Sequence, residues 1–389
     1  MNHPSLSAPS ILRVKMSPVE RMRPNERCWC HSGLKWKNCH KIRERLEPIN
    51  IFDRGASMRE TFADGFCLHS RAIGEACGGA AVASHTIQRR GGLAAIAEDQ
   101  HVISNRFEMD DLIKNSGEPA VRRVGIRKAS TFPGFCAKHD FELFEPIEKP
   151  GAHLDKRAAF LLSYRAICME YFKKKAAVET LPILKLADSG RPFPVQAQIQ
   201  NYCAVYEQGT ALGMRDIARF RSVYDSCMLD THQGGFKYSA IFFDKVLPIV
   251  LCSAWLVETD FHGNWLQKLG TNSEELELVA VNVTTIGDRT AALFGWVGGN
   301  AGPAQKFVES FHQLLDARKS SAIASMGFEH SENVYMRPSW WESLSESKKR
   351  ALLNRVLNGT PRRGRQENAL VDDQLDLISA DVIDTIEHY

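Results

Sequence analysis

Four residues that can hold a metal ion lie within thirteen positions near the start of the chain: Cys28, Cys30, Cys39 and His40. Thiolates and imidazole are the ligands that tetrahedral structural zinc prefers. The first two sulfurs share one tight turn, Ser32-Gly33 can reverse the chain, and the last two ligands complete the set. Because so short a loop has almost no core of its own, bound zinc must supply most of its folding free energy. We therefore predict a zinc site here.

The residues around these ligands resemble the SEC-C motif, a small zinc module, over residues 23–42. Further positions of its pattern are occupied by Asn25, Ser32, Gly33, Lys35 and Lys37. His31 stands where the family usually has glycine. The resemblance implies a structural site closed by four protein ligands. It also implies a small basic knob that docks on a protein partner or on nucleic acid, which leaves the function of the remaining chain open.

A second group of soft-donor residues lies between residues 60 and 150. Two cysteines precede a short apolar run followed by His85, and a C-x-x-H pair comes after 50 intervening residues. The four expected ligands are Cys67, Cys77, Cys136 and His139. This order predicts a treble-clef zinc fold, in which a knuckle and the first turn of a helix share one metal. Alternatively, His69 or His101 replaces one ligand, or the cysteines pack as small hydrophobic residues.

The second group resembles a diverged HNH nuclease. The resemblance implies that His85 is the general base, and that Asp140 replaces the family's final histidine and holds Mg²⁺ or Mn²⁺. Phosphodiester hydrolysis needs a base to activate water and a hard cation to neutralise charge on the phosphate. Nine residues separate Cys67 from Cys77, where the family usually has two. The expected function is thus metal-dependent cleavage of nucleic acid, and the alternative is a non-catalytic zinc-binding adaptor for a protein partner, a ribosome or nucleic acid.

The remaining chain shows the spacing of a helical scaffold followed by a sheet. A long helix is predicted from Asp155, with Pro182 expected to end or break it. A second helix is predicted over 197–228, and apolar strands over 237–261. A hairpin is predicted over 275–298, turning at Ile286-Gly287-Asp288, with a helix over 302–319 covering one sheet face. The acidic tail predicts a flexible linker and a final helix.

Composition sets the broad class. With 389 residues, 44% hydrophobic and 24% charged, the chain matches a soluble globular protein with room for several domains. The net charge of +3 names no partner, but residues 1–50 hold ten Lys/Arg against four Asp/Glu, a local excess of +6. Such a basic segment often meets phosphate or an acidic protein surface. Ten cysteines without a secretory signal or an apolar span of about 20 residues favour a reducing, cytoplasmic setting and no membrane contact.

These observations predict a bacterial-type α+β protein built from five consecutive segments. We expect a SEC-C zinc knob and an HNH-like, treble-clef zinc module, followed by a helical scaffold that could serve as an oligomer interface. An α+β C-terminal domain and a flexible tail complete the chain. The expected boundaries are 1–50, 60–150, 151–230, 231–358 and 359–389.

Overall fold

The computed structural model describes residues 20–49, 51–70, 77, 79–105, 115, 118–149, 153–230, 233–270, 275–358 and 366–389. Helices and sheets are both present, as an α+β protein requires. The chain falls into two compact units, each drawn from segments that are distant in sequence. The first comprises Met1–Asp64, Phe172–Ala218 and Gly270–Ser273, and the second comprises Gly65–Tyr171, Arg219–Leu269 and Glu274–Tyr389. The five consecutive segments expected from the sequence remain a prediction.

The first unit is helical in most of its described part. Its short elements are η1 (Trp36–Asn38), α1 (His40–Arg43), α2 (Ile51–Ala63) and η3 (Leu186–Asp188). It also contains the C-terminal part of α6 (Lys156–Lys185) and the N-terminal part of α7 (Phe193–Leu229), two helices that contribute to both units. Three buried side chains form the small core of this unit. Cys28 and Trp36 come from the N-terminal segment, and Phe193 is the first residue of α7.

The two long helices confirm the helical predictions for this part of the chain. α6 begins where expected, because the side chain of Asp155 accepts a hydrogen bond from the backbone N–H of Ala158 at 2.7 Å. The expected break at Pro182 is wrong, since α6 continues to Lys185. Proline removes one helical hydrogen bond, to the carbonyl four residues earlier. That carbonyl belongs to Val178, which is exposed, so water can take the place of the missing donor.

The second unit is organised around an eight-stranded sheet of order β10-β5-β8-β7-β6-β9-β2-β3. All neighbouring strands in it are antiparallel. The strands are β2 (His101–Ser104), β3 (Arg122–Gly125), β5 (Phe236–Phe243), β6 (Ile249–Leu256), β7 (Leu278–Ile286), β8 (Arg289–Val297), β9 (Val334–Met336) and β10 (Val382–His388). The predicted hairpin is confirmed as β7 and β8, and Gly287 in its turn has φ 67°. Glycine adopts such a conformation without a steric penalty.

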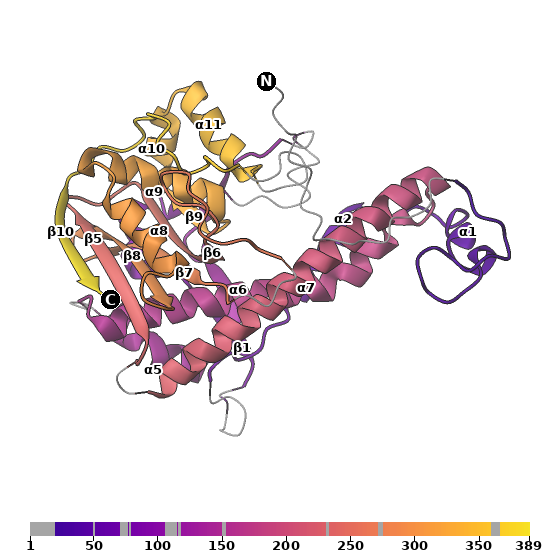
Figure 1. Cartoon of the computed structure of the whole chain (residues 1–389), viewed down its shortest axis with the longest axis horizontal. Helices are drawn as coiled ribbons and strands as arrows, with labels where there is room; N and C mark the ends of the chain where they lie inside the picture. Colours follow the sequence, from indigo (N-terminus) through magenta and orange to yellow (C-terminus); the bar gives the residue numbers. More distant parts are fainter. Residues whose placement is uncertain are drawn as a thin grey trace. The chain divides into compact units, whose positions relative to one another are not determined.

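Helices cover both faces of the central strands. On one face, α8 (Pro303–His312) and α9 (Asp316–His330) bury apolar side chains in the main hydrophobic core (Figure 1). The expected helix over 302–319 is therefore two helices, which separate at Leu315, where the backbone is not helical (φ −57°, ψ 136°). On the opposite face, α6 approaches so closely that a β-carbon at Gly295 would lie 2.1 Å from Ser163 Oγ. Position 295 therefore has no room for a side chain.

Smaller elements complete the described chain. They are β1 (Ala81–His85), η2 (Arg89–Leu93), α3 (Ala94–Ile96), β4 (Thr131–Cys136), α5 (Ala137–Glu148), α10 (Pro338–Ser343) and α11 (Glu346–Val356). β1 and β4 form a separate antiparallel pair. Among the helices that the structure describes, none combines the length and apolar character needed to cross a bilayer.

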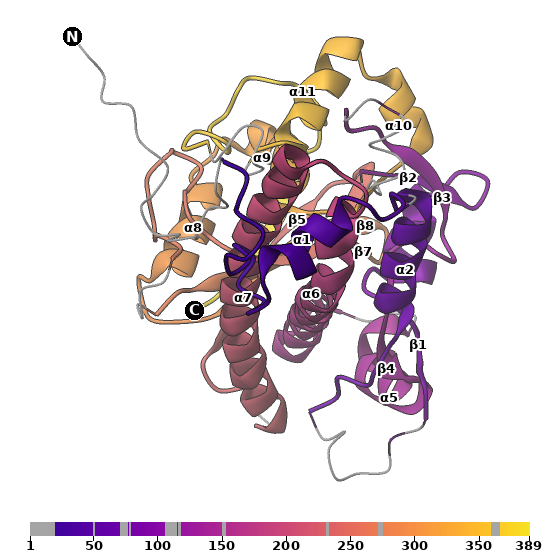
Figure 2. The same cartoon turned by 90° about the vertical axis from the view of Figure 1, so that its right-hand side faces the viewer.

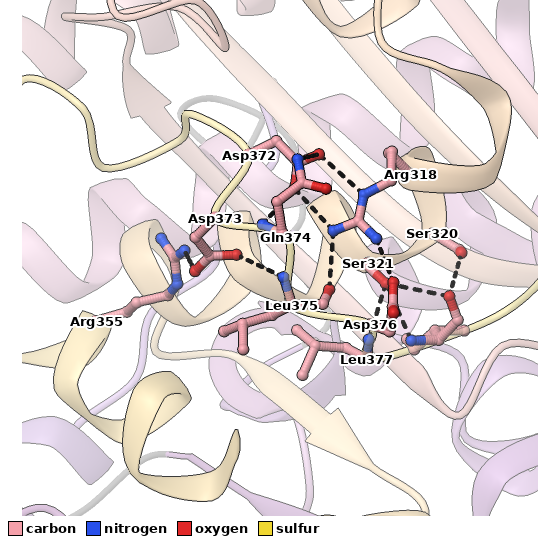
Figure 3. A network of polar contacts seen from close by, with 11 residues as sticks. Arg318, Ser320, Ser321, Arg355, Asp372, Asp373, Gln374, Leu375, Asp376 and Leu377 are labelled. Atoms are coloured by element: carbon pink, nitrogen blue, oxygen red, sulfur yellow. Dashed lines mark hydrogen bonds and ion pairs between the residues drawn. The ribbon is translucent and has the colours of Figure 1, made fainter. Parts of the chain in front are cut away.

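The predicted final helix is wrong, because the chain ends in strand β10, which pairs with β5. The acidic residues that precede β10 bind arginines of the helical layer instead of lining a helix surface (Figure 3). Arg318 forms ion pairs with Asp372, at 2.8 Å, and with Asp376. Arg355 forms an ion pair with Asp373. These contacts hold the irregular segment that leads to β10, in which Gln374 has φ 61°.

Candidate metal centres

The structure brings the four N-terminal residues predicted to bind zinc together, and we call them the N-terminal cluster. Their three sulfurs and one ring nitrogen all lie within 4.8 Å of one another. Cys28 Sγ lies 3.3 Å from His40 Nδ1, and Cys30 Sγ lies 3.5 Å from Cys39 Sγ. Ligands held about 2.0–2.3 Å from a tetrahedral zinc ion have comparable separations. The donor set and its geometry therefore fit zinc.

A tight backbone loop positions the first two sulfurs. The N–H of Cys28 donates to the carbonyl of Leu34 at 2.8 Å, and the N–H of His31 donates to the carbonyl of Cys28 at 3.1 Å. His31 has φ 60° and Gly33 has φ 77°, both in the left-handed region. A residue with a β-carbon loses about 1–2 kcal/mol in that conformation. This explains why glycine suits the position of His31 in the SEC-C pattern.

The thiols and the imidazole of the cluster hold protons that a bound metal would replace. The hydrogen bond with Cys28 lowers the pKa of the Cys30 thiol, while the same contact and burial raise the pKa of Cys28. Without a cation, one sulfur of this pair is therefore a thiolate and the other a thiol. Burial lowers the pKa of His40, but Asp188 and Cys30 outweigh burial and raise it to about 9. Zinc is held by thiolates and a neutral imidazole, so its binding would release the protons of Cys28 and His40.

A family model for the SEC-C motif matches residues 25–41. The match contains all four residues of the N-terminal cluster, so the resemblance seen in the sequence is confirmed for this segment. It covers a small part of the 389 residues and identifies the motif, not a family for the whole chain. Comparisons with curated proteins and with solved structures gave no match.

The second set of predicted ligands is also brought together, although it comes from distant parts of the sequence. We call Cys67, Cys77, Cys136 and His139 the second cluster, and their ligand atoms again lie within 4.8 Å of one another. Nδ1 of His139 lies 3.3 Å from Cys67 Sγ and 3.9 Å from Cys77 Sγ. The pKa of the Cys77 thiol is raised to about 11, mainly by its hydrogen bond with Cys136 and to a smaller extent by desolvation and by Cys67. This set fits zinc as well.

A strand pair and the helix that follows it position the second cluster (Figure 2). Cys136 ends β4 and is the N-cap of α5, and His139 lies in the first turn of that helix. The N–H of Phe66 donates to Pro133 O at 3.2 Å and that of Leu68 donates to Gly134 O at 2.8 Å. The segment that carries Cys67 therefore runs beside β4. The helix part of the predicted arrangement is therefore present, whereas most of the expected knuckle between Cys67 and Cys77 lies outside the described residues.

Helices α6 and α7 anchor the segment that carries Cys67. The guanidinium of Arg221 donates to the carbonyl of Leu68, the next residue along the chain, and its Nε lies 3.0 Å from Asp225. The hydroxyl of Tyr164 donates to Asp225 at 2.7 Å. Sequence reasoning missed these residues, because single polar side chains in long helices carry no spacing signal of a supporting role.

The two residues expected to perform nuclease chemistry have other contacts. The carboxylate of Asp140 accepts a hydrogen bond from Ser84, whereas Nε2 of His85 lies 3.1 Å from the carbonyl oxygen of Ile126. Ser84 and His85 are consecutive residues of β1 in regular register with β4, so their side chains point to opposite faces. Asp140 lies on the face of Ser84. The structure does not bring His85 and Asp140 together.

The histidines considered as replacement ligands lie outside both clusters. The ring of His69 stacks on that of His139, with centroids 4.2 Å apart. Nδ1 of His101 lies 2.6 Å from the carbonyl oxygen of Asp99.

Burial lowers the pKa of His85, which keeps its imidazole neutral near pH 7. The neutral form is compatible with a general base, but the contact of its Nε2 is with the backbone carbonyl of Ile126 and not with Asp140.

Proposed function

We propose that this protein is a non-catalytic adaptor that contains two structural zinc centres and docks on a partner through its SEC-C motif. The observation that supports this most strongly is the convergence of two complete Cys₃His sets, each with all ligand atoms within 4.8 Å. Four protein ligands fill a tetrahedral zinc shell and leave no position for a reacting water. Zinc bound in this way stabilises local folds.

The exposed side of the SEC-C motif supplies a surface suited to docking. Arg27, Lys35 and Lys37 are exposed there and give it positive charge. Leu34 is 51% exposed and Ile42 is 49% exposed, which is unusual for large apolar residues in so small a motif. Basic side chains interspersed with apolar ones suit an acidic protein surface that has apolar contacts, and basic side chains alone would suit a phosphate backbone.

Metal analysis of the purified chain tests the zinc proposal. We expect two zinc ions per chain in the wild type, and one in each of the double variants Cys28→Ser/Cys39→Ser and Cys67→Ser/Cys136→Ser. Cys227→Ala is the matched control, because this thiol lies outside both clusters, and it should retain both ions. Wild-type protein that is folded and holds no zinc in the presence of excess Zn²⁺ would overturn the proposal.

Binding measurements with labelled DNA and RNA test the class of partner. Contact with phosphates releases counterions, so nucleic-acid binding would weaken steeply with salt and would be lost on charge reversal in Lys35→Glu/Lys37→Glu. We expect no such salt-dependent binding if the surface receives an acidic protein. The hydrogen-bond partners of His85 and Asp140 do not favour cleavage of nucleic acid.

A further inference from the structure

The buried carboxylate of Asp188 contacts the N-terminal cluster from a distant part of the sequence. Asp188 is fully buried and ends η3, in the connection between α6 and α7. Its Oδ2 lies 2.8 Å from Nε2 of His40, the ring nitrogen that does not face the sulfurs. Its Oδ1 lies 2.8 Å from Nη1 of Arg43, and the side chain of Gln200 donates to Oδ2 at 2.8 Å. Asp188 itself lies outside the matched SEC-C segment.

This arrangement fixes the state of the histidine ring. A carboxylate accepts hydrogen bonds, so the proton of a neutral His40 ring is held on Nε2 by Asp188. The lone pair of Nδ1 then points toward Cys28 and Cys39, whose sulfurs lie 3.3 and 3.4 Å away. Metal-binding histidines commonly donate their other N–H to a carboxylate, which sets the tautomer and ring orientation. Asp188 is therefore placed to orient a ligand without itself reaching the ion.

Further contacts pack the SEC-C motif against the same connection. The side chain of Gln196 donates to the carbonyl of His40 at 3.1 Å, and the N–H of Gly190 donates to the carbonyl of Arg43 at 2.7 Å. Gly190 has φ 69°, and a β-carbon there would lie 2.6 Å from the carbonyl oxygen of Leu46. The ring of Phe193 meets those of Trp29 and Trp36 edge-on, with centroids 6.3 Å away in both cases.

We propose that Asp188 is a positioning residue for the N-terminal metal centre, and that it couples metal binding to docking of the SEC-C motif on the α6–α7 connection. The inference rests on the proposed zinc site. The docked motif, in which Asp188 orients His40, binds metal more tightly than the undocked motif. Because the coupling is reciprocal, bound metal stabilises the docked state by the same free energy. A purely structural role for Asp188 would need only its ion pair with Arg43, and would not require the contact with His40.

A site-resolved competition experiment on the full chain tests the first part of the inference. Zinc-loaded protein is incubated with increasing chelator, free thiols are alkylated, and protection of each cysteine is read by mass spectrometry. We expect Asp188→Ala to lower the chelator concentration that exposes Cys28 and Cys39 by 10–100-fold. Glu207→Gln, which removes a carboxylate that pairs with Lys185 at 2.8 Å on the same helices, should match the wild type.

Two further readouts separate positioning from simple packing. Asp188→Asn keeps the size of the side chain, and we expect it to change the absorption spectrum of the Co²⁺-substituted N-terminal centre. Gln200→Leu removes a donor to Asp188 but keeps the contact between Asp188 and His40, so it should leave that spectrum unchanged. Protection of Cys67 and Cys136 in every variant should equal that of the wild type, which verifies that the second unit is folded.

The outcomes distinguish this inference from the proposed zinc site. Equal chelator resistance in wild type and Asp188→Ala would overturn the role of Asp188, while the zinc proposal would stand. Equal Co²⁺ spectra in Asp188→Asn and wild type would also overturn it. In contrast, Cys28 and Cys39 that react freely in wild-type protein with excess Zn²⁺ would refute the zinc site itself. For the docking part, hydrogen exchange of residues 186–200 should rise on chelation in the wild type, and an unchanged rate would refute the coupling.

Discussion

The N-terminal cluster and the second cluster have the same donor set but are assembled in different ways. In the first, Cys28 and His40 are 12 residues apart, and a short loop brings the ligands together. In the second, Cys67 and His139 are 72 residues apart, and a strand pair, a helix and an anchored segment are needed. Closing a long loop costs more conformational entropy than closing a short one. We therefore expect the first centre to depend mainly on its metal, and the second mainly on surrounding structure.

Removal of zinc should produce the largest effect and should act unequally on the two regions. The core beside the N-terminal cluster contains three buried apolar residues, whereas the sheet of the second unit has an extensive core. Structural zinc supplies about 10–16 kcal/mol to isolated zinc-finger folds. We therefore expect a chelator to abolish hydrogen-exchange protection over residues 25–45 while strands β5 to β8 stay protected. Loss of protection in both regions at the same chelator concentration would contradict the distinction between them.

Single cysteine substitutions should affect the stability of the two regions unequally. Cys136 is fully buried and joins β4 to α5, so Cys136→Ser removes a ligand and leaves a hydroxyl among apolar neighbours. We expect it to lower the melting temperature of the second unit by several degrees, as a loss of about 2 kcal/mol would. Cys39→Ser should release one zinc ion and leave that transition unchanged. Calorimetry with metal analysis measures both, and a shift of the main transition in Cys39→Ser would argue against the comparison.

The support from α7 predicts a smaller effect that is specific to the second cluster. Arg221→Met removes the donor to the carbonyl of Leu68 and leaves Asp225 with fewer partners. A buried group that loses a charged hydrogen-bond donor costs about 1–3 kcal/mol. We expect Cys67 to become more reactive toward alkylation during chelator competition, with Cys28 unaffected. Arg215→Gln, on the same helix and paired with Asp216, is the control. Equal protection of Cys67 in Arg221→Met and wild type would show that the anchor is dispensable.

The sequence predicted which residues form both clusters but not the residues that support them. Metal ligands are few in type, and their order predicted even the set that spans 72 residues. Asp188 and Arg221 act through contacts across long sequence distances, and neither belongs to a motif. The ligand geometry could therefore be anticipated from residue chemistry, whereas its support depends on how α6 and α7 pack.

The error at the C-terminus has a related cause. Four of the seven residues in 382–388 are β-branched and favour a strand, and pairing with β5 satisfies that preference. The preceding carboxylates suggested a solvated helix surface, but Arg318 and Arg355 recruit them. Arg318 and Arg355 lie 54 and 18 residues before the carboxylates that they bind. Non-local partners of this kind leave no local periodicity to read.

Substitution of His85 should have the smallest effect of all and tests whether the second cluster is more than structural. An HNH-type reaction needs a base and a metal-binding carboxylate directed at one phosphate, but strand alternation in β1 separates His85 from Asp140. We expect neither wild type nor His85→Ala to cleave supercoiled plasmid or RNA in Mg²⁺ or Mn²⁺. Cleavage by the wild type that is lost in His85→Ala, with zinc content and melting temperature retained, would contradict the structural role of this centre and establish a catalytic one.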